Sequence, residues 1–453
     1  MATTKILRRI GTVIPGGEFG RGVLTLVAGT GTAQVVVVAS SPILTRLYTP
    51  ADYGVYSVAT ALLTVVVTIT CLRYDFAAPL PESDVEAANV LALSLVTAVA
   101  ISTATAVALV LLGHDMLALF GAAVLAPYIP LMALGQLGAG VVSALTNWAI
   151  RTKTFYEIAA TRMTQSIALV GAQIGLGVAG CGAPGLFIGD VAGRVTGSTR
   201  LARAAWRSHA SAFRRVSWSG MVQVAKRYRR FPIFSSWSAL LAALGLQVPL
   251  LALVALYGTT AGGEYALASR VCAAPLTLVA GAVGQVFVAD SARLVHTQPA
   301  AILRLFGRTT GVLARSAAGP ALILGLAAPQ LAEPVFGHGW REAGLFVAIL
   351  AASYFLEFVM TATGDVIYVI ERQDLQLARE IVRCGLIAGA IPAAAILGLS
   401  PVGSIVVLSA ARCATYVFYG VVSWYAIRGR VREAAAAVGA DPDLIDGTAP
   451  PSA

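Results

Sequence analysis

The chain has few charged residues: Asp, Glu, Lys and Arg make up 12% of its 453 residues, against about 25% in ordinary globular proteins. Hydrophobic residues make up 57%, which is more apolar surface than a water-soluble fold can bury. Disordered proteins need a polar composition, and disulfide scaffolds need many more cysteines than the 5 present here. The composition therefore predicts an integral membrane protein.

Signatures of nucleotide, metal and redox chemistry are also missing. No G-x-x-x-x-G-K-[ST] loop occurs, so the chain is not expected to hydrolyse ATP by itself. The cysteines lack C-x-x-C spacing and the 4 histidines are isolated, so we expect no metal site and no cofactor. The net charge of +10 is explained by basic residues that meet anionic lipids of the inner leaflet, so no nucleic-acid partner is expected.

Apolar runs of about 20 residues, the length of a membrane-crossing helix, recur along the chain. Backbone groups in lipid must bond within their own segment, so these runs indicate helices rather than the strands of a barrel. We expect an all-α polytopic membrane protein with about twelve transmembrane helices. The predicted spans are 23–44, 54–72, 88–112, 128–149, 158–179, 183–201, 233–257, 264–287, 309–326, 344–370, 381–397 and 402–425.

Lys and Arg gather at both ends of the chain and in the connectors after even-numbered spans, whereas the other connectors hold only Arg46 and Arg341. Positive charge is retained on the cytoplasmic side, so both termini are expected in the cytoplasm. The predicted organisation is an N-terminal lobe, a basic cytoplasmic connector, a C-terminal lobe and a disordered cytoplasmic tail. These parts cover residues 1–202, 203–231, 232–427 and 428–453.

The two halves of the chain share local spacings. Tyr48, Gly54 and Tyr56 recur with the same spacing as Tyr257, Gly263 and Tyr265. The pair Arg151 and Arg162 recurs in the same way as Arg372 and Arg383. Equivalent spans point the same way across the membrane, so the pattern predicts a parallel internal repeat.

Arginines inside the predicted spans are candidate site residues, because an intramembrane charge usually faces a cavity or a partner. Asp190 and Arg194 lie four apart on one helix, where they form either a structural pair or part of a cavity. Arg270 is the preferred cavity candidate. Arg315 either snorkels to the interface or faces the cavity. Arg412 lies too deep to snorkel and serves either helix packing or the cavity.

Two carboxylates, Glu357 and Asp365, lie about two turns apart on one predicted span with Thr361 between them. They are candidates for carrying a coupling ion; the alternatives are neutralisation of nearby arginines or, for Asp365, a position at the cytoplasmic exit. The outward connectors are short and hold few acid–base groups. Transport is therefore favoured over catalysis, and the protein is not expected to be an enzyme.

Several segments together resemble the Wzx-type polysaccharide flippases of bacteria, the polysaccharide biosynthesis proteins of the MOP exporter superfamily. The resemblance runs nearly end to end and depends on the order of the motifs and their placement at helix ends. The segments are LTRLYTPADYG from Leu44, LRYDFAAPLP from Leu72, NWAIRTKTF from Asn147, RYRRFP from Arg227, QVPLL from Gln247, GGEYALASRV from Gly262 and VFGHGWREAG from Val335.

The resemblance implies two six-helix lobes around a cavity in the bacterial cytoplasmic membrane. It implies translocation of a polyprenyl-diphosphate-linked oligosaccharide, such as an O-antigen or lipopolysaccharide repeat unit, from the inner to the outer leaflet. A polysaccharide polymerase and other export machinery are implied partners, besides membrane lipids. Arg46 and Arg73 fall in the family-like segments at helix ends, where they bind the diphosphate, fix loop geometry or contact lipid head groups.

Three alternatives stay open at this stage. A major-facilitator transporter shares the span count, but its G-x-x-x-D-R-x-G-R-like loop is replaced here by LRYDFAAPLPESD. A drug or cation exporter of the MOP superfamily would share the fold. A membrane polysaccharide polymerase or glycosyltransferase is the enzymatic alternative.

Overall fold

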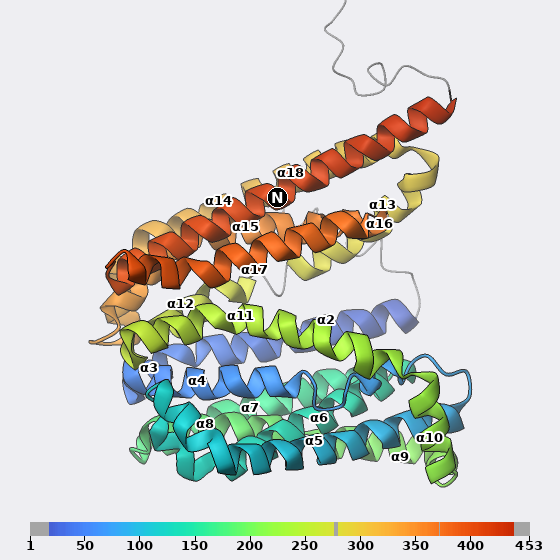
Figure 1. Ribbon diagram of the computed structural model, residues 1–453, viewed down its shortest axis with the longest axis horizontal. Coiled ribbons are helices and arrows are strands. Elements are labelled where there is room, and N and C mark those ends of the chain that lie inside the picture. The colour runs from blue at the N-terminus through green and yellow to red at the C-terminus, as the bar shows by residue number, and fades with distance from the viewer. Residues whose placement is uncertain (1–17, 276–279, 371, 439–453) are drawn as a thin grey trace, which may run out of the picture. The chain divides into compact units, whose positions relative to one another are not determined.

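The protein is helical almost throughout (Figure 1). The computed structural model describes residues 18–275, 280–370 and 372–438, and no strand occurs among them. The predicted all-α class is confirmed. Within the described residues, 8 helices are long and apolar enough to cross a membrane, so the chain is a multi-pass membrane protein. They are Thr25–Leu47, Pro50–Val67, Asp84–Leu119, Ala123–Arg151, Phe231–Tyr257, Ala300–Phe336, Arg341–Val369 and Pro401–Glu433.

The described residues form two compact units. The N-terminal unit comprises those within Ile14–Leu267 together with the short segment Glu333–Trp340. Its helices up to the middle of α12 lie in one bundle (Figure 1). They are α2 (Glu18–Ala39), α3 (Ser41–Leu47), α4 (Pro50–Val67), η1 (Tyr74–Ala77), α5 (Asp84–Leu119), η2 (Ala123–Tyr128), α6 (Ile129–Arg151), α7 (Phe155–Val178), α8 (Gly182–Val195), α9 (Ser198–Phe213), α10 (Trp218–Arg227), η3 (Phe231–Ser235) and α11 (Ser236–Tyr257).

The C-terminal unit comprises the described residues within Ala268–Ala332 and Arg341–Ala453. α12, which crosses the boundary between the units, is Thr259–Pro275. Within this unit, α18 packs against both α15 and α17. The remaining helices are α13 (Gly281–Thr297), α14 (Pro299–Phe336), α15 (Arg341–Gly364), α16 (Val366–Val369), α17 (Gln373–Ile396) and α18 (Pro401–Val438).

The predicted spans fall largely on helices, but several bounds differ from the expectation. The span 54–72 runs past the end of α4 at Val67, and 344–370 includes both α15 and α16. The span 264–287 includes parts of α12 and α13 and residues 276–279, which lie outside the described part. The span predicted at 183–201 is cut where Gly197 adopts φ +89, and α9 begins at Ser198. Within the predicted basic connector, residues 203–231, α9 and α10 account for most of the residues. The tail was expected to be disordered from residue 428, yet α18 continues to Val438; residues 439–453, like residues 1–17, lie outside the described part.

The motif LTRLYTPADYG builds the start of α4. Thr49 and Asp52 form a capping box, in which each side chain accepts a hydrogen bond from the other's backbone N–H, and Pro50 supplies the backbone angle favoured at the first helical position. The Asp52 carboxylate also accepts a hydrogen bond from the backbone N–H of Ala183 at 2.9 Å. One short acidic side chain therefore both starts α4 and fixes the start of α8 beside it.

The two echoing segments predicted from the spacing of Tyr and Gly contact each other reciprocally. A Cβ on Gly54 would lie 1.8 Å from the carbonyl oxygen of Thr259, and a Cβ on Gly263 would lie 1.8 Å from the carbonyl oxygen of Pro50. In the repeat register, Pro50 and Thr259 are equivalent residues, as are Gly54 and Gly263. The backbones of α4 and α12 therefore meet through the same pair of positions in each half, which supports the predicted internal repeat.

Candidate functional site

The N-terminal unit contains a cavity of about 650 Å³ among α2, α4, η1, α6, α7 and α8. Its size lies within the range of about 300–1,000 Å³ that is typical of ligand pockets. Polar groups are numerous in its lining for a site built by membrane-spanning helices. The arginines, amides and hydroxyls that line it are Thr30, Gln34, Ser143, Thr146, Asn147, Arg162, Gln165, Ser166 and Arg194.

Arg162 is the cation of this cavity that has no carboxylate partner among the described residues. It lies seven residues into α7, about 10 Å from the start of the helix, and its side chain is exposed at the cavity. Its one described hydrogen bond goes to the amide oxygen of Gln165 at 3.5 Å. Since a guanidinium stays charged in proteins, Arg162 presents an uncompensated positive charge with free donors to whatever enters the cavity.

Arg194 contributes a compensated charge to the same cavity. Its Nε donates to the Asp190 carboxylate at 2.6 Å along α8, and the Tyr56 hydroxyl donates to the other oxygen of that carboxylate at 3.4 Å. Asp190 is buried, whereas Arg194 reaches the cavity wall. The two readings of this pair are therefore compatible, because the residues neutralise each other and Arg194 still lines a polar space.

The segment after α4 supplies another wall of the cavity through strained backbone. Leu72 and Arg73 both adopt positive φ, +46 and +60, which is uncommon for residues other than glycine and typical of functional sites. This turn places the Arg73 guanidinium 3.9 Å from the centre of the Phe76 ring, and Phe76 lines the cavity. Arg73 thus contacts a lining residue, Phe76, and is not itself among the lining residues.

Asp75 adds a buried carboxyl group directly behind the cavity wall. It is 4% exposed and accepts a hydrogen bond of 2.6 Å from the hydroxyl of Ser143, a lining residue. Burial raises the pKa of the Asp75 carboxyl, while the Ser143 hydrogen bond and the Arg73 charge oppose that rise. A group of this kind can hold or release a proton next to the cavity.

Arg46 lies away from the cavity, at the end of α3. It donates a hydrogen bond to the carbonyl oxygen of Pro334 at 3.1 Å. Nearby, the indole of Trp340 is 2% exposed and donates to the carbonyl of Thr45 at 2.9 Å. Arg46 therefore anchors the Glu333–Trp340 segment in the N-terminal unit, which corresponds to the loop-fixing alternative considered from the sequence.

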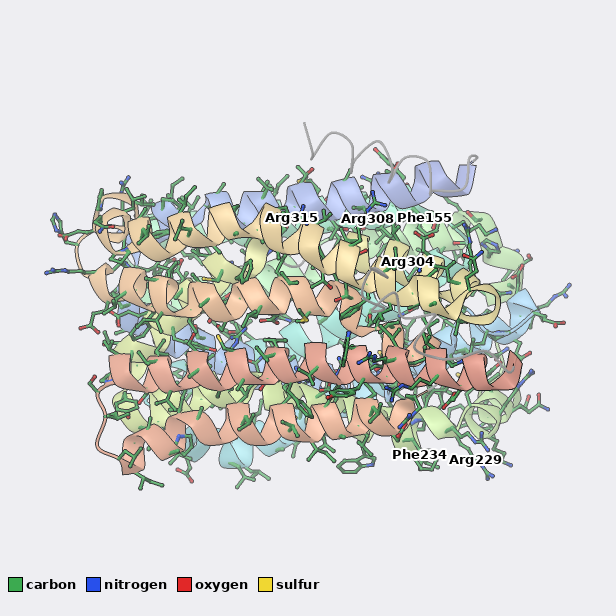
Figure 2. The ribbon with its side chains drawn as sticks, turned by 90° about the horizontal axis from the view of Figure 1, so that it is seen from above. Phe155, Arg229, Phe234, Arg304, Arg308 and Arg315 are labelled. Carbon is green, nitrogen blue, oxygen red and sulfur yellow. The ribbon has the colours of Figure 1, made fainter. Side chains whose placement is uncertain are left out.

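In the C-terminal unit, Arg270 lies half-buried on α12, and no ion pair involves it among the described residues. Arg315 lies on α14 and shares one face of that helix with Arg304 and Arg308 (Figure 2). All three side chains are exposed, and none has a carboxylate partner within the described part of the chain. They form a cationic row along one face of α14.

Two further charged groups of the C-terminal unit, Arg412 and Glu357, compensate each other. Arg412 is 9% exposed, forms an ion pair with Glu357, and lies 4.1 Å from the centre of the Tyr354 ring. The packing alternative for Arg412 therefore has a definite partner. Asp365 is exposed at the break between α15 and α16, and the adjacent Arg379 donates to the carbonyl oxygen of Gly364 at 3.0 Å.

The chain is similar to one known protein family and to several solved structures. A family model described as polysaccharide biosynthesis protein matches residues 43–344, which is more than half of the chain. The chain belongs to this family. The resemblance stated from the sequence motifs is thereby confirmed, and the matched region includes the cavity walls contributed by α4, η1, α6, α7 and α8 but not the wall from α2. A search of curated proteins found no match.

Solved structures with the same fold are MOP-superfamily exporters. A lipid II flippase MurJ in an inward closed conformation superposes with a TM-score of 0.62 at 11% identity, over 87% of this chain and 86% of that one. An inward-facing multidrug-resistance MATE transporter of the MOP superfamily gives 0.60 at 16% identity, over 90% and 95%. A Vibrio cholerae MATE transporter gives 0.53 at 15% identity, over 95% and 98%. At these identities the likeness establishes the fold.

Sequence reasoning missed Arg162 and Asp75 as site residues. Arg162 was noted for its part in the repeat, and its depth in a predicted span was a signal that could have marked it as a cavity residue. Asp75 falls in a quoted motif just after a span, and nothing in the sequence shows that the backbone folds back to bury it. Within the described residues, no cluster of His, Cys, Asp or Glu is arranged to hold a metal ion.

Proposed function

We propose that the protein translocates a polyprenyl-diphosphate-linked oligosaccharide from the inner to the outer leaflet of the bacterial cytoplasmic membrane. In this proposal, both termini face the cytoplasm and the two units move against each other in alternating access. Family membership supports a role in polysaccharide biosynthesis. The observation that carries the proposal is the polar cavity of the N-terminal unit with the uncompensated Arg162.

The chemistry of the cavity fits such a head group. A diphosphate needs paired, charge-assisted hydrogen bonds, which the planar guanidinium of Arg162 provides. Sugar hydroxyls need donors and acceptors, which Gln34 and Asn147 provide among others. Each unpaired polar group in hydrocarbon costs several kcal/mol, so a lined cavity lowers the barrier to crossing while the apolar tail stays in lipid.

Export of a cationic drug is disfavoured by the same charge, because Arg162 would repel a cationic ligand. Enzymatic transfer of sugars would require an acid–base pair at a reacting centre. In the described cavity lining, the charged groups are Arg162 and Arg194, which are poor proton carriers. The proposal is therefore translocation without a change of covalent bonds.

Coupling to an ion gradient is a separate part of the proposal. Of the two sequence candidates, Glu357 is held by Arg412, so Asp365 is the one exposed to exchange with solvent. Asp365→Asn should make translocation insensitive to collapse of the proton gradient. Glu357→Gln should instead lower the stability of the protein, because it breaks the ion pair with Arg412. If both replacements leave the sensitivity unchanged, neither carboxylate is the coupling site.

The test of the function is the leaflet on which the lipid-linked oligosaccharide accumulates after deletion of the gene. A membrane-impermeant lectin is applied to intact and to lysed spheroplasts. Accumulation on the inner side only, rescued by wild type but poorly by Arg162→Gln, supports a flippase with a cationic site. Accumulation on the outer side places the block after translocation and supports the polymerase or transferase alternative. An unchanged distribution supports export of another substrate.

A further inference from the structure

The connector between α8 and α11 carries a surface that the proposed translocation does not use. Residues 198–237 contain no Asp or Glu. Two of the basic residues there have carboxylate partners elsewhere in the unit, Arg200 with Glu157 and Arg227 with Glu86. The others are exposed and have no acidic partner among the described residues; they are Arg203, Arg207, Arg214, Arg215, Lys226, Arg229 and Arg230.

Large apolar side chains are interleaved with these cations. Trp206 on α9 is 54% exposed and Trp218 at the start of α10 is 72% exposed. Phe234 and Trp237, at the start of the following span, are 67% and 65% exposed. Figure 2 shows Arg229 and Phe234 at the same edge of the molecule. A surface that faces water would not expose four large aromatic side chains between arginines, because the apolar area of these side chains favours burial.

Each of the two connector helices packs one face against the rest of the N-terminal unit. Leu201, Ala205 and Ala212 of α9 are buried in one core cluster with Trp148 of α6. Val224 of α10 is buried in another with Val90 of α5. Fixing one face in the core leaves Arg203, Trp206 and Arg207 of α9 and Lys226 of α10 exposed on the other side, which is the arrangement of a helix lying in the interface of a bilayer. The remaining cations lie in the turns that follow these helices.

We infer that this surface, formed by the seven unpaired cations with Trp206, Trp218, Phe234 and Trp237, binds the headgroups of anionic phospholipids in the adjoining leaflet. Charge complementarity selects an anionic partner, because no acid of the connector competes for these cations. The aromatic side chains select a lipid surface over an aqueous polyanion, since tryptophan partitions to the headgroup level. The chain also enters a membrane span at Phe231, directly after Arg229 and Arg230, which brings these cations close to the bilayer surface.

The test measures which lipid lies next to Trp206 and Trp218 in the full-length protein. The protein is reconstituted in vesicles of phosphatidylcholine and phosphatidylglycerol, with one or the other lipid brominated so that it quenches nearby tryptophan. The contribution of these two residues is the wild-type signal minus that of Trp206→Phe/Trp218→Phe. We expect brominated phosphatidylglycerol to quench this contribution about threefold or more strongly than brominated phosphatidylcholine at equal bromine content, and raised salt to reduce the preference.

Matched charge variants separate local recognition from net charge. Arg214→Gln/Arg215→Gln should bring the two quenching values together, whereas Arg304→Gln/Arg308→Gln, which removes the same charge from exposed positions on α14, should leave the preference intact. Size-exclusion profiles check that each variant is folded. Equal quenching of the wild type by both lipids, or equal loss in both double variants, would overturn the inference. Absence of quenching by either lipid would also overturn it, and would indicate an aqueous surface for an acidic protein partner.

Discussion

Two arginines that the internal repeat makes equivalent differ in their surroundings. Arg383 of the C-terminal unit pairs with Glu380 at 2.6 Å, and the same carboxylate accepts the Tyr419 hydroxyl at 2.8 Å. Arg162 of the N-terminal unit has no carboxylate partner in the part of the chain that the structure describes. The repeat register places Ala159 where Glu380 stands, and a Cβ on Gly29 would lie 2.5 Å from the Cβ of Ala159. Close packing of α2 on α7 therefore leaves no room for a carboxylate.

The difference separates two uses of an arginine within the helical units. A compensated arginine joins helices and has little left to offer a ligand, because its donors are occupied. An uncompensated arginine beside a cavity stabilises nothing inside the protein and is available to an anion. In the C-terminal unit Arg383 and Arg412 are held in ion pairs, whereas Arg162 of the N-terminal unit is the residue that the proposed function assigns to binding.

The largest loss of stability is expected when the ion pair between Arg412 and Glu357 is broken. Arg412→Ala leaves Glu357 as an unpaired charge in a membrane-spanning helix and should destabilise the protein by about 3–5 kcal/mol. The melting temperature of the purified protein, followed by size-exclusion chromatography after heating, reports this loss. Arg412→Leu/Glu357→Leu removes both charges and should recover most of it. A single variant as stable as wild type would show that this pair is not structural.

Gly54 and Gly263 test whether the repeat-related segments of α4 and α12 contact each other symmetrically. Gly54→Ala and Gly263→Ala each place a methyl group 1.8 Å from a carbonyl oxygen, which neither backbone can accommodate without shifting. Each should destabilise the protein by about 3 kcal/mol. Gly171→Ala on α7, where a Cβ meets nothing within 4 Å, is the control and should be neutral or slightly stabilising. Very unequal effects of the first two would contradict the symmetric contact.

Exchanging the repeat-related arginines for glutamine should give opposite phenotypes. Arg162→Gln should reduce translocation about tenfold or more, because one charge-assisted interaction with the ligand is lost, with little change in melting temperature. Arg383→Gln should lower the melting temperature while translocation per folded molecule stays near wild type. The lectin assay and the thermal assay, run on both variants, measure the two quantities. Equal losses of translocation would show that pairing does not distinguish the two sites.

Part of this architecture could be predicted from the sequence. The helical spans follow from apolar run length, and the repeat follows from the spacing of Tyr48, Gly54 and Tyr56. The Asp190–Arg194 pair was also accessible, because residues four apart share a helix face. What escaped prediction depends on tertiary contacts. The partner of Arg412 lies 55 residues away, and burial of Asp75 depends on the strained turn at Leu72 and Arg73.

The family-like motifs illustrate the same limit. VFGHGWREAG was recognised as a pattern, but its physical reason emerges only when Trp340 is seen buried against Thr45 and edge-on to the Tyr53 ring, 5.0 Å away. A sequence shows which residues accompany one another and leaves open which of them touch. Motifs at helix ends therefore predicted the fold better than the site.

The smallest expected effect is the dependence of stability on pH that Asp75 causes. Its carboxyl group accepts a hydrogen bond from the hydroxyl of Ser143, a cavity-lining residue. Burial raises the pKa of Asp75 from 3.8. At a pH between 3.8 and the raised pKa, the folded state therefore retains a proton that the unfolded state releases. Stability should therefore fall as pH rises from about 4 through the raised pKa and stay constant above it. Asp75→Asn cannot ionise, so its melting temperature should lack this decline.

Ser143→Ala sharpens the test of Asp75, because the Ser143 hydroxyl stabilises the ionised carboxylate. Without that hydrogen bond the pKa of Asp75 should rise further, and the decline in melting temperature should extend to higher pH. If the decline instead persists in Asp75→Asn, another group causes it. If Ser143→Ala shifts it to lower pH, the hydroxyl stabilises the neutral acid, and Asp75 would then enter the cavity as a proton donor rather than as a charge.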